Sequence, residues 1–267
     1  MTGILSGALL AHLTGDAKTH AGANLVATLT AMALVQNDVL RSTRSRSHTL
    51  TRAELRWAMT AQAPGLTAGL LAAFNSCLPI LVVARWFPTG LPTFALGERL
   101  YRMALSLSLP VAQSLHGHVP SASGALTLRR MATALVPLTM VATAIGAGFA
   151  TALPAASRIY TRGDIIMEWP TAVCFGIALS CLVVTSSLGV AGLDASGHSV
   201  GLVRASVCGL VVCLVTCAAA AVWAPSAGGV AGAVCAAEAC VLAVQIRELS
   251  RVQKLIPTGD ATSPRPS

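Results

Sequence analysis

The chain has 267 residues, of which 54% are hydrophobic and 10% are charged. Soluble domains contain roughly a quarter charged residues, so this composition excludes an ordinary soluble domain and indicates a polytopic membrane protein. The formal net charge of +8 does not indicate a nucleic-acid partner, because most Lys and Arg lie in short connections between apolar runs, without interleaved aromatics. The apolar runs are about 20 residues long and do not alternate polar with apolar residues, which favours transmembrane helices over a barrel.

Two apolar runs, residues 1–13 and 21–40, begin the chain. The first has no basic region before it and no clear cleavage site, so its pattern is not that of a signal peptide. It looks instead like the second half of a transmembrane helix. Residues 41–56 follow with five Arg and one Glu, and the positive-inside rule places this loop in the cytoplasm.

Six longer apolar runs follow, at about residues 57–83, 91–120, 131–153, 165–193, 200–223 and 230–246. The first of these contains Pro64 and Pro79, which predict kinks or a break in its helix. The loops assigned to the inside, together with Arg204 and the tail, contain twelve basic residues, against three on the outside. We therefore expect eight spans in the cytoplasmic membrane, with the C-terminus in the cytoplasm.

The run over residues 91–120 is of membrane length but contains charged residues near its start. A charge at the bilayer centre costs at least about 2.5 kcal/mol, so such residues usually pair or face a polar cavity. Glu98 and Arg102 have the i, i+4 spacing of a helical ion pair. Arg99 points about 100° away from them, so we expect it to contact something outside its own helix. The alternative is that all three side chains reach the lipid head groups.

Other polar residues lie inside the apolar runs. Gln62 and Asn75 are candidates to line a path through the membrane, although asparagines in membranes often form interhelical hydrogen bonds instead. Glu238 is a second intramembrane charge, unless it stays protonated and only packs. The eight cysteines all lie in apolar runs, with no C-x-x-C pair and no histidine at ligand spacing. We therefore expect no metal and no cofactor.

Two stretches resemble the polysaccharide flippases of the multidrug/oligosaccharidyl-lipid/polysaccharide export superfamily, which share the MATE-like fold. FALGERLYRMALSLSLPVAQSLHGHVP is similar to one of their helices, and the match uses Glu98, Arg99, Arg102, Pro110, Gln113 and Pro120. SAGGVAGAVCAAEACVLAVQIREL is similar to their last helix through Gly229, Gly232 and Glu238. The resemblance covers roughly residues 57–250.

The resemblance implies an all-α transmembrane bundle with four parts. Residues 57–250 would form the six-helix C-terminal lobe, and residues 1–40 the last two helices of a partial N-terminal lobe. Residues 41–56 would be the basic cytoplasmic linker, and residues 251–267 a disordered cytoplasmic tail. Members of the family have more helices than this chain, in two lobes, so a partner chain could supply the missing ones.

The activity implied by the resemblance is the translocation of a polyprenyl-pyrophosphate-linked glycan across the cytoplasmic membrane, amid membrane lipids. Arg99 and Arg102 would bind the pyrophosphate, because guanidinium groups match phosphate oxygens. Glu98 would orient Arg102 or respond to a coupling ion, and Glu238 is a further candidate for coupling. Sugar hydroxyls would meet the amide side chains of Gln62, Asn75 and Gln113.

Three alternatives to this activity remain. One is a drug or cation antiporter of the same superfamily, for which acidic cavity residues would be expected. The second is a truncated protein without transport activity, acting as a scaffold, as a partner subunit, or not at all. The third and weakest alternative is a membrane enzyme, since no nucleophile with a base, metal box or phosphate loop is recognisable.

Overall fold

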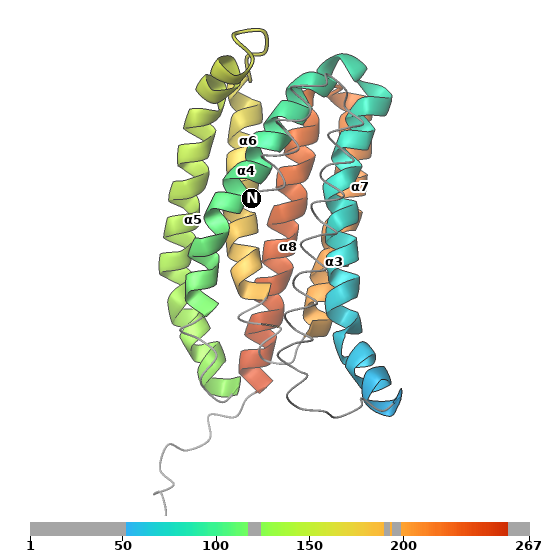
Figure 1. The fold of residues 1–267 in the computed structure, drawn as a ribbon, viewed down its shortest axis with the longest axis vertical. Coiled ribbons are helices and arrows are strands. Elements are labelled where there is room, and N and C mark those ends of the chain that lie inside the picture. The colour runs from blue at the N-terminus through green and yellow to red at the C-terminus, as the bar shows by residue number, and fades with distance from the viewer. Residues whose placement is uncertain (1–51, 117–123, 190–192, 194–198, 256–267) are drawn as a thin grey trace, which may run out of the picture. The chain divides into compact units, whose positions relative to one another are not determined.

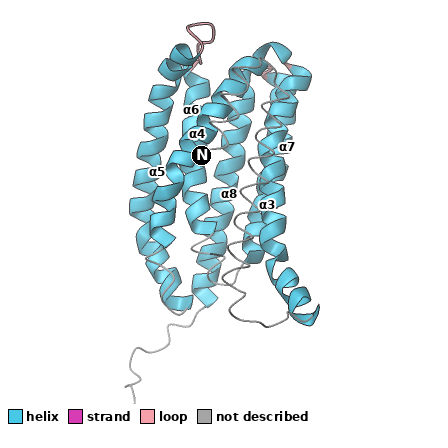
Figure 2. Ribbon diagram, in the orientation of Figure 1, coloured by secondary structure: helices cyan, strands magenta, loops and turns pink. Residues whose placement is uncertain are grey.

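The computed structural model describes residues 52–116, 124–189, 193 and 199–255. The predicted runs at residues 1–13 and 21–40, and most of the linker at 41–56, lie outside these ranges. The chain separates into two units, Met1–Ala58 and Met59–Ser267. Everything below concerns the second unit, apart from the first turns of α3. Within the described ranges the regular elements are all helical (Figures 1 and 2).

Six α-helices and one short 3-10 turn make up the described part. Their bounds are α3 Arg52–Trp86, η1 Pro88–Gly90, α4 Leu91–His116, α5 Gly124–Tyr160, α6 Trp169–Ser187, α7 Ser199–Trp223 and α8 Ala227–Leu255. Successive helices run in opposite directions, so that their connections alternate between the two ends of the bundle (Figure 1).

Five of these helices contain a segment that is long and apolar enough to cross a membrane. The segments are Ala63–Trp86, Thr133–Tyr160, Trp169–Ser187, Ser199–Trp223 and Ala227–Val252. The exception is α4, which contains the three charged residues Glu98, Arg99 and Arg102. The prediction of an all-α protein of the multi-pass membrane type is thereby confirmed in its general form.

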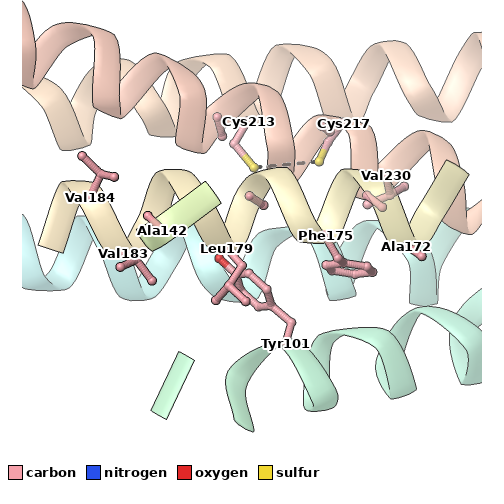
Figure 3. Packing of buried hydrophobic residues seen from close by; sticks show 14 of the residues in the cluster. Tyr101, Ala142, Ala172, Phe175, Leu179, Val183, Val184, Cys213, Cys217 and Val230 are labelled. Carbon is pink, nitrogen blue, oxygen red and sulfur yellow. Dashed lines mark hydrogen bonds between the residues drawn. The ribbon is translucent and has the colours of Figure 1, made fainter. Parts of the chain in front are cut away.

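The helix at the centre of the packing is α6. It packs against α4, α5 and α8, and α7 in turn packs along α8. Phe175 and Leu179 of α6 lie toward Tyr101 of α4 (Figure 3). Cys213 and Cys217 of α7 lie on the opposite side of α6. A helix that is apolar on all sides is stable only when it is surrounded by other helices or lipid, and α6 has this composition.

The contact between α5 and α6 depends on two glycines. A Cβ atom placed on Gly146 would overlap the carbonyl group of Gly176 and the hydroxyl of Ser180. A Cβ atom on Gly176 would in turn lie 2.6 Å from the carbonyl oxygen of Gly146. The two backbones therefore approach as closely as only residues without a side chain allow, which is the usual packing mode of membrane helices.

Two helices, α5 and α8, extend well beyond the apolar runs that predicted them. α5 begins at Gly124, inside the predicted loop at 121–130, and ends at Tyr160, inside the predicted loop after residue 153. α8 continues to Leu255, so residues 251–255 are helical and do not belong to a disordered tail. The physical reason is that helical hydrogen bonds also form in water, whereas the apolar pattern marks only the part in lipid. Residues 256–267 lie outside the described ranges.

Two prolines do not interrupt α3. The helix is continuous through Pro64 and Pro79, so α3 is not broken at either proline, although each proline removes one helical hydrogen bond. Beyond Pro79 the helix joins the core, where Val83 is fully buried. Before it, Leu66, Leu70 and Phe74 are mostly exposed on the protein surface. This half of α3 therefore leaves room between itself and the other helices.

Candidate functional site

A cavity of about 340 Å³ lies between α3 and the helices α4, α6, α7 and α8. Its wall is mainly apolar, but it includes an unusual number of polar groups for the interior of an apolar bundle. The charged residues in the wall are Glu98, Arg102 and Glu238, and the amide side chains are Asn75 and Gln245. The volume lies within the range of roughly 300–1,000 Å³ that is typical of ligand pockets.

The pair of Glu98 and Arg102 forms as the sequence predicts. Nε of Arg102 donates a hydrogen bond of 3.0 Å to Oε1 of Glu98, and Nη2 donates to the same oxygen. Nη2 also donates to the main-chain carbonyl oxygen of Ser76 on α3, at 3.4 Å. Arg102 therefore connects α4 to α3 at the wall of the cavity. Its side chain is 54% exposed and that of Glu98 only 14%.

Arg99 lies away from this cavity. Its guanidinium carbon is 5.6 Å from the centre of the Tyr160 ring, at the end of α5. The prediction that Arg99 contacts something outside its own helix is confirmed. The expectation that Arg99 and Arg102 together bind one anion finds no support in this geometry, because Arg99 is not part of the cavity wall. The 100° step between successive helical residues turns the two side chains in different directions.

Three aromatic rings form one side of the cavity. The ring of Phe175 lies 5.7 Å from that of Phe94 and 5.8 Å from that of Tyr101, measured between centroids, in tilted arrangements. Phe94 and Phe175 are each 1% exposed and Tyr101 is 7% exposed. The hydroxyl of Tyr101 is buried and has no hydrogen-bond partner in the described part of the chain. Buried tyrosine hydroxyls normally find a partner, so this one is available to a ligand.

Two polar residues of α8 lie in the cavity wall, seven residues apart and therefore on the same face of the helix. Glu238 has no hydrogen bond or ion pair with the residues that the structure describes, and it is close enough to Tyr101 to act on its hydroxyl electrostatically. Gln245 is 6% exposed, and its Oε1 atom is without a hydrogen-bond partner among the described residues.

The candidates from the sequence are brought together only in part. Asn75, Glu98, Arg102 and Glu238 meet in one cavity, and Oδ1 of Asn75 is a further buried atom without a hydrogen bond in the described ranges. The backbones of Gln62 and Gln113 lie in α3 and α4, but their side chains are outside the described part of the structure.

The sequence reasoning missed Tyr101 and Gln245. The signal for Gln245 was its position two helical turns after Glu238 in an apolar run, on the same face. Tyr101 lies between Arg99 and Arg102 in the sequence. Its burial against Phe175, which is distant in sequence, could not be recognised from the sequence alone.

A separate charged cluster joins the ends of α7 and α8. Glu248 accepts a hydrogen bond of 3.0 Å from Nη1 of Arg251, and Nη1 of Arg204 lies 3.7 Å from the same carboxylate oxygen. Arg204 thus pairs across the two helices. Both arginines are more than half exposed, so the cluster is a surface feature outside the cavity.

Searches against protein-family models, curated proteins and solved structures find no match for this chain. The assignment of a function therefore depends on the cavity and on the residues of the two stretches described above.

Proposed function

We propose that the chain is a membrane transporter of the flippase type, which moves a polyprenyl-pyrophosphate-linked glycan across the cytoplasmic membrane. The observation that supports this best is a cavity of ligand size whose mainly apolar wall contains Arg102 and several other polar side chains. The resemblance of the α4 sequence to polysaccharide flippases supports the choice of cargo.

A sugar-pyrophosphate head group does not cross about 30 Å of hydrocarbon unaided. The protein therefore has to hold the head group in a polar cavity while the lipid tail stays in the bilayer. The cavity next to α3 meets the first requirement, and the exposed apolar side chains on the first half of α3 suit contact with lipid. In this proposal α4 also crosses the membrane, with its charges turned inward or paired, and the whole protein has eight spans with a cytoplasmic C-terminus.

Arg102 is the residue that we assign to the phosphate groups. A guanidinium has five N–H donors, and Arg102 uses only Nε and Nη2 for Glu98 and Ser76. The donors on Nη1 have no hydrogen-bond partner among the residues that the structure describes, and we assign them to phosphate oxygens. Glu98 holds the guanidinium at a fixed position on α4, so that the charge is already oriented before the cargo binds.

The test is a flipping assay in proteoliposomes that contain a fluorescent lipid-linked oligosaccharide. We expect the wild-type protein to make the glycan of the inner leaflet accessible to an external glycan-cleaving enzyme. Arg102→Ala should abolish this, while Arg99→Ala should retain it, because Arg99 lies outside the cavity. Two results would contradict the proposal. One is flipping that persists in Arg102→Ala, and the other is a wild-type protein that does not flip the glycan either alone or with a co-reconstituted partner chain.

A further inference from the structure

The charges in the cavity do not balance. Glu98 is compensated by Arg102 through two hydrogen bonds, whereas Glu238 has no such partner among the described residues. An ionised carboxylate in an apolar interior is strongly unfavourable unless a proton or a positive charge accompanies it. The empty cavity therefore has an excess of one negative charge when both carboxylates are ionised.

The hydrogen-bonding groups in the cavity also favour a positively charged ligand that donates hydrogen bonds. Oδ1 of Asn75, Oε1 of Gln245 and the hydroxyl of Tyr101 are buried and unpartnered within the described ranges. Carboxamide and carboxylate oxygens accept hydrogen bonds but do not donate them. Since the large majority of buried polar groups in proteins are paired, these oxygens suit a ligand with several donors.

An inorganic cation does not fit this arrangement well. The described residues contain no group of three or more His, Cys, Asp or Glu side chains that could hold a metal ion. The oxygens are distributed over α3, α4 and α8, and the cavity has a volume of about 340 Å³, far more than one ion needs. The aromatic residues Phe94, Tyr101 and Phe175 in the wall offer no ligand to an inorganic ion apart from the hydroxyl of Tyr101.

We infer that the part of the cavity around Glu238 binds an ammonium group, and that the cargo is a lipid-linked glycan with an unacetylated amino sugar. This inference rests on the proposed function and assigns Glu238 to the cargo rather than to a coupling ion. The ammonium group supplies three donors and no acceptor, which complements Glu238 and the carboxamide oxygens. Arg102, at the α3 side of the same cavity, takes the phosphate, so the bound head group is zwitterionic.

The experiment compares two fluorescent polyprenyl-pyrophosphate glycans that differ only in one group, a free amine or its N-acetyl derivative. Wild-type proteoliposomes should flip the amine form about tenfold faster, which corresponds to about 1.4 kcal/mol. Glu238→Gln keeps the shape of the side chain but removes its charge, and the two rates should then become similar. Glu248→Gln is the matched control, because it removes a carboxylate of the same helix outside the cavity, and it should retain the preference.

A second measurement separates this inference from the proposed function. Binding of an alkyl glucosaminide and of its N-acetyl derivative to the purified protein needs no flipping. Binding of the amine alone, lost in Glu238→Gln, supports the inference even if neither glycan is flipped. Equal binding and equal flipping of both compounds by the wild type would overturn the inference while leaving the flippase proposal intact. The inference would also be overturned if the wild type showed no preference for the amine and Glu238→Gln lost the flipping of both glycans equally. That result would identify Glu238 as a coupling residue.

Discussion

Arg102 of α4 donates a hydrogen bond of 3.4 Å to the main-chain carbonyl oxygen of Ser76 on α3. This bond, together with the ion pair to Glu98, fixes the only arginine in the wall of the described cavity. It places a positive charge where α3 and α4 border the same space, and it makes Arg102 both a structural link and a candidate ligand for phosphate.

The two roles of Arg102 can be separated by substitution. Arg102→Lys keeps the positive charge but loses the fork geometry, so we expect flipping to fall by about tenfold, or about 1.4 kcal/mol. Arg102→Met keeps the length of the side chain without charge and should abolish flipping. Thermal unfolding in detergent, followed by circular dichroism, should change little in both, because a half-exposed ion pair contributes only about 0–1 kcal/mol. A large loss of thermal stability in Arg102→Lys would show that the link to α3 is the main role of this residue.

Gly146 should tolerate no side chain. Gly146→Ala places a methyl group against the carbonyl of Gly176 and should destabilise the α5–α6 contact by about 1–3 kcal/mol, as overpacking does. Gly148→Ala is the control on the same helix, because a Cβ atom there has nothing within 4 Å. We expect Gly148→Ala to be neutral or slightly stabilising in chemical denaturation, since alanine favours a helix over glycine. Equal stability of the two variants would contradict the close packing of these helices.

Phe175 should contribute more to stability than the exposed Phe74 of α3. Its ring contacts both Phe94 and Tyr101 and is 1% exposed, whereas Phe74 on α3 is 66% exposed. Phe175→Ala should cost about 3–5 kcal/mol through the cavity that it leaves. Phe74→Ala should cost much less, because lipid replaces the lost ring. The two free energies of unfolding can be compared in the same detergent by denaturant titration.

The charged cluster of Arg204, Glu248 and Arg251 should be weak and sensitive to salt. Arg204→Ala removes the pair across α7 and α8, and we expect a loss of about 0–1 kcal/mol at low ionic strength. In 1 M salt the screening length falls to about 3 Å, so most of this difference should disappear. Arg247→Ala, an exposed arginine of α8 without an ion pair in the described part of the chain, is the control. A loss that persists in high salt would indicate packing of the Arg204 stem rather than electrostatics.

The sequence predicted the interactions that depend on one helix alone. The spacing of Glu98 and Arg102 was enough for their ion pair, because positions i and i+4 are neighbours on any helix. The turn of about 100° per residue was likewise enough to separate Arg99 from Arg102. The apolar runs identified the helices, but not their ends: α5 and α8 continue beyond the apolar residues, because a helix needs no lipid to keep its hydrogen bonds.

Only the tertiary structure decided which of these polar residues share a cavity. Asn75, Tyr101 and the pair of Glu238 and Gln245 come from three helices, and no local pattern in the sequence relates positions on different helices. Their meeting depends on the approach of α4 and α8 to α6. Gly97 permits the approach of α4, because a side chain there would overlap the ring of Phe175. The same packing turns Arg99 toward Tyr160 and leaves Glu238 without an ion-pair partner in the described ranges. The sequence determined a helical membrane protein with charges in its apolar runs, and the packing between helices determined which of those charges face one another.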